Sequence, residues 1–86
     1  MMFAIQDEAH AELSGAFPTR EDAVAELQRL RSIAWDQPPN KAPCMSWRTC
    51  GRHYSLVEFD NRFTPWRTLS CVSALDISAD GVSWNL

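Results

Sequence analysis

The chain has 86 residues, of which 45% are hydrophobic and 22% are charged, and its formal net charge is −3. This length predicts one small domain spanning residues 1–86, and the composition is that of a globular protein rather than a disordered or fibrous one. No apolar run approaches the roughly 18 residues of a membrane span, and residues 1–10 lack the pattern of a signal peptide. An odd number of cysteines, three in all, favours a reduced cytoplasmic protein over a secreted disulfide framework.

The charged side chains are unevenly distributed along the chain. Residues 1–40 carry seven acidic and three basic side chains, whereas residues 41–67 carry five basic and two acidic ones. We call residues 41–67 the basic segment, because they form the one basic part of an acidic protein. Such a segment is a candidate surface for an acidic partner.

Residues 3–17 predict a β-hairpin. Phe3 and Ile5 alternate with less apolar residues, the polar pair Asp7-Glu8 indicates a turn, and Leu13 to Phe17 alternate again. The alanines and glutamates of the second arm would also suit a helix.

Residues 18–34 predict an amphipathic helix. Thr19 stands at the N-cap with Asp22 three positions later, a variant of the capping box. The apolar residues form one stripe at helical spacing, which should face a sheet: Ala23, Val24, Leu27, Leu30, Ile33 and Ala34. We expect the helix to stop because Pro38 and Pro39 cannot continue it.

The rest of the chain predicts a loop and three strands. The loop covers residues 35–46, and a strand bent at Gly51 covers residues 47–60. A second strand covers residues 66–78, with Leu69, Cys71, Ser73, Leu75 and Ile77 on one inward face. Gly81 suits a hairpin turn before a last strand, Val82–Leu86, with Val82, Trp84 and Leu86 inward. The predicted fold is therefore α+β: an antiparallel sheet of about five strands, in the order β-β-α-β-β-β, with one helix on one face.

The run FAIQDEAHAELSGAF followed by PTREDAVAEL resembles the hairpin–helix opening of many small uncharacterised bacterial domains, including orphan proteins carried on mobile gene cassettes. This resemblance implies a fold and no activity. More distantly, Gly15, Phe17, Glu21, Ala23 and Leu27 resemble the step into a helix of the SPOR peptidoglycan-binding domain. This chain has no second helix, so the SPOR fold and its glycan ligand are not implied.

The thiols and histidines are the first candidates for chemistry. Cys44, Cys50, His53 and Cys71 have the side chains of a zinc site, but five residues separate the first two cysteines where a zinc knuckle has two to four. We therefore expect no metal and no cofactor. A Cys44–Cys50 disulfide would not survive a reducing cytosol, so we expect free thiols. Cys50 and His53 would form a catalytic pair only through a bulge at Gly51, and His10 is expected to be a solvated turn residue.

The rings and guanidinium groups of the basic segment are the second candidates. Tryptophan, tyrosine and arginine dominate the hot spots of protein interfaces. Among the residues of these types in the segment, we expect six to contact a partner: Trp47, Arg48, Arg52, Tyr54, Arg62 and Trp66. The contrasting interpretation is internal: the rings fill the core, and the arginines neutralise the acidic hairpin and helix.

We expect a small non-enzymatic protein-binding module of the adaptor, inhibitor or immunity type. The alternative is a small-molecule-binding protein or enzyme with a pocket between helix and sheet that uses Cys50, His53 and Glu58. Single-stranded nucleic acid is a further alternative, which the overall acidity makes unlikely. The uncharged strand Val82–Leu86 has no edge protection, which favours a homodimer.

Overall fold

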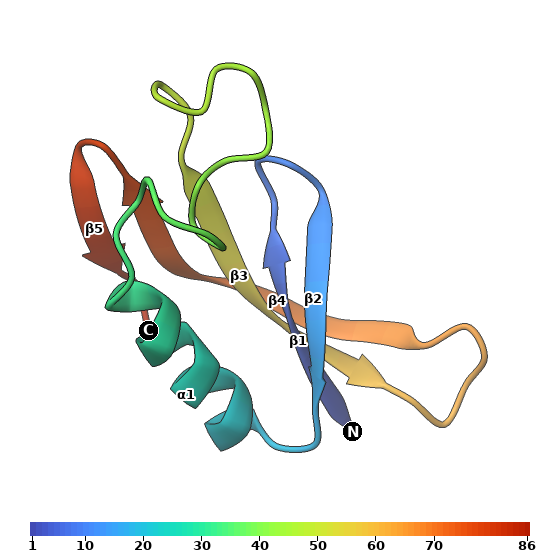
Figure 1. Ribbon diagram of the computed structural model, residues 1–86. Coiled ribbons are helices and arrows are strands. Elements are labelled where there is room, and N and C mark those ends of the chain that lie inside the picture. The colour runs from blue at the N-terminus through green and yellow to red at the C-terminus, as the bar shows by residue number, and fades with distance from the viewer.

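A computed structural model describes residues 1–86. Its elements are β1 (Met2–Asp7), β2 (Glu12–Phe17), α1 (Arg20–Arg31), β3 (Arg52–Asp60), β4 (Arg67–Ser78) and β5 (Gly81–Trp84). The five strands form one antiparallel sheet in the order β2-β1-β3-β4-β5. Figure 1 shows this sheet with α1 on one face, so the predicted α+β fold is confirmed.

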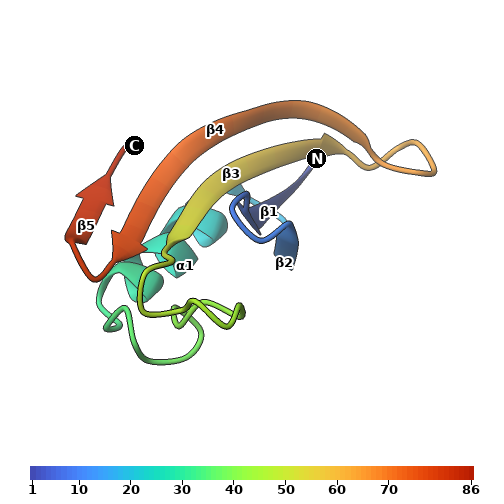
Figure 2. The ribbon, with the colours of Figure 1, turned by 90° about the horizontal axis from the view of Figure 1, so that it is seen from above.

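The core lies between α1 and the concave face of the strongly curved sheet, as Figure 2 shows. The helix buries Ala23, Leu27 and Leu30, the stripe that its sequence predicts. From the sheet, β1 contributes Ile5, β3 contributes Tyr54 and Leu56, and β4 contributes Ala74, Leu75 and Ile77. Removing these apolar side chains from water contributes most of the stabilisation of so small a domain.

The predicted start of α1 is confirmed, but its end is not. Thr19 is the N-cap, and its Oγ1 accepts a hydrogen bond from the backbone N–H of Asp22 at 3.1 Å. The helix ends at Arg31, well before Pro38, and Ser32 is its C-cap. The side chain of Asn40 folds back and donates to the carbonyls of Leu30 and Ile33, both at 2.8 Å. A buried amide from the following loop, together with the backbone N–H groups of Ser32 and Ile33, thus satisfies carbonyls that a helix end leaves free.

The strand β3 starts five residues later than predicted. Residues 46–50 instead form a turn, in which the backbone N–H groups of Thr49 and Cys50 both donate to the carbonyl of Ser46 at 2.8 Å. The strand begins directly after Gly51, whose backbone lies so close to β4 that a Cβ would stand 2.6 Å from the carbonyl oxygen of Ile77. Any side chain at this position would push β3 and β4 apart.

The predicted common face of β4 is wrong for its first half. The pairing of β3 with β4 is irregular between Tyr54 and Ser55, where Tyr54 faces Leu75 but Ser55 faces Ser73. The extra residue is Ala74, and a bulge of this kind reverses which side chains face the core. Cys71 is therefore exposed on the face opposite α1, whereas Leu75 and Ile77 remain buried as predicted.

The last hairpin forms as predicted, with Gly81 at a φ of +133°. β5 lies at one edge of the sheet and pairs with only the last part of β4, from Leu75 to Ser78. Trp84 is half-buried against the core, whereas Val82 and Leu86 are exposed rather than inward. No helix here has the length and apolar character needed to cross a membrane.

Candidate functional site

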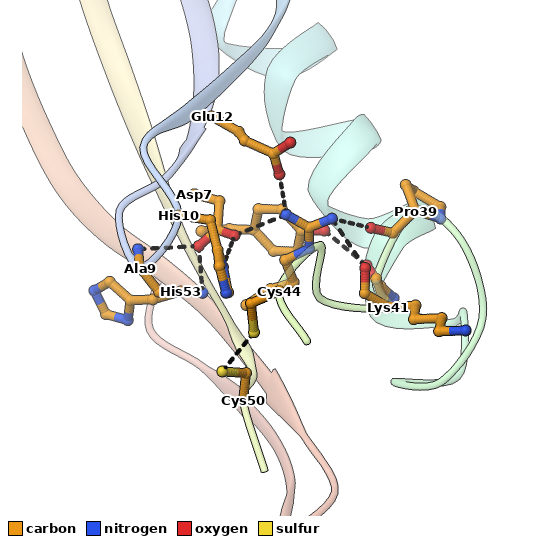
Figure 3. Close-up of polar contacts among 12 residues, drawn as sticks. Asp7, Ala9, His10, Glu12, Pro39, Lys41, Cys44, Cys50 and His53 are labelled. Carbon is orange, nitrogen blue, oxygen red and sulfur yellow. Dashed lines mark hydrogen bonds and ion pairs between the residues drawn. The ribbon is translucent and has the colours of Figure 1, made fainter. Parts of the chain in front are cut away.

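Asp7, at the end of β1, is the centre of a polar cluster that Figure 3 shows. Its side chain is 2% exposed. One carboxylate oxygen accepts hydrogen bonds from the backbone N–H groups of Ala9 and His53, each at 3.1 Å. The other contacts Nη1 of Arg52 at 2.9 Å and Nδ1 of His10 at 2.7 Å. Burial alone would raise the pKa of Asp7, but the hydrogen bonds from Arg52, His53 and His10 outweigh it and lower the pKa.

Arg52, the first residue of β3, joins this cluster to the preceding loop. Its Nη1 also pairs with Glu12, and its Nη2 donates to the carbonyls of Pro39 and Lys41 at 2.9 and 3.1 Å. The side chain is only 10% exposed, and Nε is buried without a partner. The prediction that Arg52 contacts a partner is therefore wrong. Antiparallel pairing of β1 with β3 brings the start of β3 beside the acidic turn of the first hairpin. The guanidinium group of Arg52 is therefore engaged by the protein's own carboxylates.

Tyr54 is likewise internal, with 5% of its surface exposed. Its hydroxyl donates to the side-chain oxygen of Asn40 at 2.9 Å, and burial raises its pKa to about 12. The expectation that Tyr54 contacts a partner is corrected for the same reason as for Arg52: both lie where β3 is covered by the helix and the loop.

The cysteines and histidines separate into two groups that sequence spacing did not reveal. The sulfurs of Cys44 and Cys50 lie 2.8 Å apart as free thiols, and the histidine beside them is His10. His53 instead pairs with Asp76, and Cys71 donates to Glu8 at 3.1 Å on the other side of the sheet. His10 is not a solvated turn residue, since its side chain is 12% exposed. The sequence did hold one indication that His10 lies near these cysteines. His10 follows β1, and β1 pairs with β3, the strand that begins shortly after Cys50.

This first group is electrostatically asymmetric. Hydrogen bonds from Cys50 and from His10 lower the pKa of the Cys44 thiol, while Cys44 raises the pKa of Cys50. The pKa of His10 is raised by its hydrogen bonds to Cys44 and Asp7. Cys44 is thus the thiol in the pair that more readily becomes a thiolate, the form that binds metals and attacks electrophiles.

The predicted pocket of Cys50, His53 and Glu58 does not assemble. The two surface hollows of the molecule include none of the three residues. The hollow nearer the Asp7 cluster has a volume of about 230 Å³ and is lined in part by Asp7, Arg52 and Tyr54. Most of its polar groups already bond to one another.

The far end of β3 and the first half of β4 form a projecting hairpin, which we call the arm (residues 60–73); Figures 1 and 2 show it extending away from α1. Residues 61–66 at its tip are all exposed. Arg62 pairs with Asp60, with Nη2 and Oδ2 2.7 Å apart, yet 79% of its side chain faces solvent. Phe63 is 43% exposed and Trp66 is 45% exposed. Of the six expected contacts, Arg62 and Trp66 lie together here.

The rings at the tip carry cationic neighbours. The guanidinium carbons of Arg62 and Arg67 lie 5.9 and 4.8 Å from the centre of the Phe63 ring. Trp66 packs against Phe59, with ring centres 5.8 Å apart. These contacts hold apolar rings and positive charge side by side on one small surface.

Trp47 and Arg48 lie in the loop before β3, at the opposite end of this strand from the tip (Figure 1). Nine residues of strand separate the two regions by roughly 25–30 Å. Trp47 is half-buried against Trp35 at 5.7 Å and carries Lys41 and Arg48 over its ring. The six expected contacts therefore do not form one face.

The arm also has an open backbone edge. β5 pairs with β4 only from Leu75 onwards, so no strand covers the outer edge of residues 67–73. All seven of these residues are exposed, including Leu69 at 47% and Val72 at 44%. This stretch contains one charged side chain, Arg67, and no proline. Unpaired N–H and C=O groups on such an edge can accept another strand.

Comparison of the chain with protein-family models, with curated proteins and with solved structures finds no significant match.

Proposed function

We propose that the chain is a small non-enzymatic protein-binding module, of the adaptor, inhibitor or immunity type, that binds its partner through the arm. The partner supplies an extended segment that pairs with the edge of β4 at residues 67–73, adding a sixth strand to the sheet. The observation that carries the proposal is this uncovered edge with exposed apolar side chains. Natural proteins usually protect such edges with charge, proline or a covering element.

The side chains of the arm support a partner of defined chemistry. Leu69 and Val72 offer apolar contacts along the edge, while Phe63 and Trp66 form an apolar tip. Arg62 and Arg67 flank that tip, and the Asp60 carboxylate neutralises only part of this charge. A segment with alternating apolar residues and acidic residues near one end fits this surface. Backbone pairing supplies affinity and the side-chain pockets supply specificity in this mode of binding.

The first experiment locates the contact. A photo-crosslinking amino acid replaces Leu69 on the arm or Leu13 on β2, and adducts formed in the native host are identified by mass spectrometry. Leu13 is a matched control because it is 58% exposed on a strand at the opposite edge of the sheet. We expect a protein adduct at position 69 that is absent at position 13. Equal adducts at both positions would contradict the proposal.

The second experiment uses a synthetic peptide that covers the crosslinked segment of that partner. Leu69→Lys places a charge on the edge and Trp66→Ser removes the apolar tip, and each should weaken binding by about tenfold or more, as truncation of a hot spot does. Val82→Ser is the control, since Val82 is 52% exposed but lies on β5. Unchanged affinity in both arm variants would place the contact elsewhere.

Two other occupants give different outcomes. Pairing with a second copy, which the sequence favours at the strand Val82–Leu86, would give a dimer by light scattering. If Leu69→Lys abolished that dimer, the contact between the two copies would lie on β4 instead. A single-stranded oligonucleotide stacked on Phe63 and Trp66 would bind with a steep salt dependence and be lost in Trp66→Ser. Either result would replace the protein partner proposed here.

A further inference from the structure

Three ligand atoms suited to a soft metal meet at the end of β3 opposite the arm. They belong to His10 in the first hairpin turn and to Cys44 and Cys50 in the loop before β3, and all lie within 4.8 Å of one another. Around a tetrahedral zinc ion, bonds of about 2.0–2.3 Å place neighbouring ligand atoms roughly 3.3–3.8 Å apart. The two sulfurs, 2.8 Å apart, would need to separate by about 1 Å to enclose an ion.

The histidine is already held in the manner of a metal ligand. Asp7 contacts its Nδ1 at 2.7 Å, which favours the tautomer with the proton on Nδ1 and the lone pair on Nε2. A carboxylate that fixes the second nitrogen of a ligating histidine is the usual outer shell of a zinc site. Asp7 is itself fixed by Arg52 and two backbone N–H groups, so the ring orientation is set by a buried group.

Both thiols are also held in place by the backbone. The turn at Ser46 brings Cys50 back beside Cys44, because the N–H of Cys50 donates to the carbonyl of Ser46. This turn leaves the two sulfurs 2.8 Å apart. Gly51 packs against the carbonyl of Ile77 and fixes where the chain leaves this loop.

We propose that His10, Cys44 and Cys50 bind one zinc ion, or an ion of the same thiophilic divalent class, with a fourth position open to water or to an external ligand. Two thiolates would neutralise the ion, and the neutral imidazole would bind through Nε2. Sulfur and imidazole ligands select zinc over the hard cations calcium and magnesium, which prefer oxygen. The three residues are partly exposed, so the ion can enter.

Cobalt(II) titration of the reduced, chelator-treated full chain tests this site. We expect one equivalent to give thiolate-to-cobalt charge-transfer bands and the visible bands of tetrahedral cobalt, both displaced by zinc. Cys44→Ser, Cys50→Ser and His10→Ala should each abolish the tetrahedral spectrum. Two matched controls should retain it: Cys71→Ser removes the exposed third thiol, and His53→Ala removes the other histidine.

A second measurement needs no variant and guards against loss of folding. Zinc should protect Cys44 and Cys50 of the wild-type chain, but not Cys71, from alkylation, as read by peptide mass spectrometry. The proposal is overturned if the reduced chain shows no tetrahedral cobalt spectrum. It is also overturned if the Cys71→Ser or His53→Ala variant loses the spectrum while folded, or if zinc protects the three thiols equally. None of these results bears on the arm.

Discussion

The two ends of β3 use an arginine–carboxylate pair in opposite ways. At the start of the strand, Arg52 is 10% exposed, and its partners Asp7 and Glu12 come from the first hairpin. Beyond its end, Arg62 is 79% exposed and pairs with Asp60, two residues away. The first pair joins segments distant in sequence, whereas the second shapes only its own turn. An arginine in a sequence is therefore structural or available according to the fold around it.

Replacement of Arg52 should test this contrast most strongly. Arg52→Ala leaves the buried Asp7 carboxylate without its main cation, and loss of one partner of a buried pair costs roughly 3–5 kcal/mol in free energy of unfolding. Urea denaturation measures the change. Arg62→Ala is the matched control and should lower the denaturation midpoint far less, because an ion pair with so exposed an arginine contributes only about 0–1 kcal/mol. Similar effects in both variants would contradict the assignment of different roles.

The Asn40 side chain should show the next largest effect. It donates to two carbonyls at the end of α1 and accepts from Tyr54, so Asn40→Ala removes three hydrogen bonds and leaves the Tyr54 hydroxyl and the Ile33 carbonyl without their partner. The expected loss in free energy of unfolding is about 1–3 kcal/mol. Asn61→Ala, in the exposed turn of the arm, is the control. A loss no greater than that of the control would show that water replaces the amide.

Titration of the single tyrosine, Tyr54, tests the burial of side chains near the start of β3. Burial raises the pKa of Tyr54 from 10.0 to about 12, so its phenolate absorbance should not appear until well above pH 10. Because the folded-state pKa is raised, the corresponding stabilisation is complete below pH 10 and is lost as the pH rises towards 12. Urea-unfolded protein is the control and should titrate near pH 10. Folded protein that titrates there would contradict the burial of Tyr54.

Asp60 gives the corresponding measurement at the arm. Hydrogen bonds from the side chain and backbone of Arg62 lower its pKa from 3.8 to about 2. The stabilisation from a lowered pKa is present above pH 4 and is lost as the pH falls towards 2. Carboxyl NMR should follow this titration, and Arg62→Ala should return the pKa towards 3.8. An unchanged pKa in that variant would exclude the Arg62 side chain as the main cause.

The sequence predicted the local parts of this fold and few of the distant contacts. The capping pair Thr19–Asp22 and the stripe of Ala23, Leu27 and Leu30 were sufficient for the helix, because they depend on neighbours within two turns. The bulge at Ala74 depends on the register between two strands, and one extra residue moved Cys71 to the opposite face. Periodicity alone carries no record of such a shift.

The candidate sites show the same limit. Arg62 and Trp66 lie on an exposed turn, and the sequence of that turn was sufficient to predict that these two side chains are accessible. Arg52 was assigned to the surface because its partners Asp7 and Glu12 lie at least forty positions earlier. His10 was overlooked for a related reason: Cys44 and Cys50 reach it only because β1 pairs with β3. Side chains whose neighbours come from distant segments are those that spacing rules do not find.

The tip of the arm, residues 61–66, contributes no buried residue to the core. Substitutions there should therefore leave the packing between α1 and the sheet in place. If the arm binds a partner as proposed, its specificity can therefore be changed at the tip without altering the core.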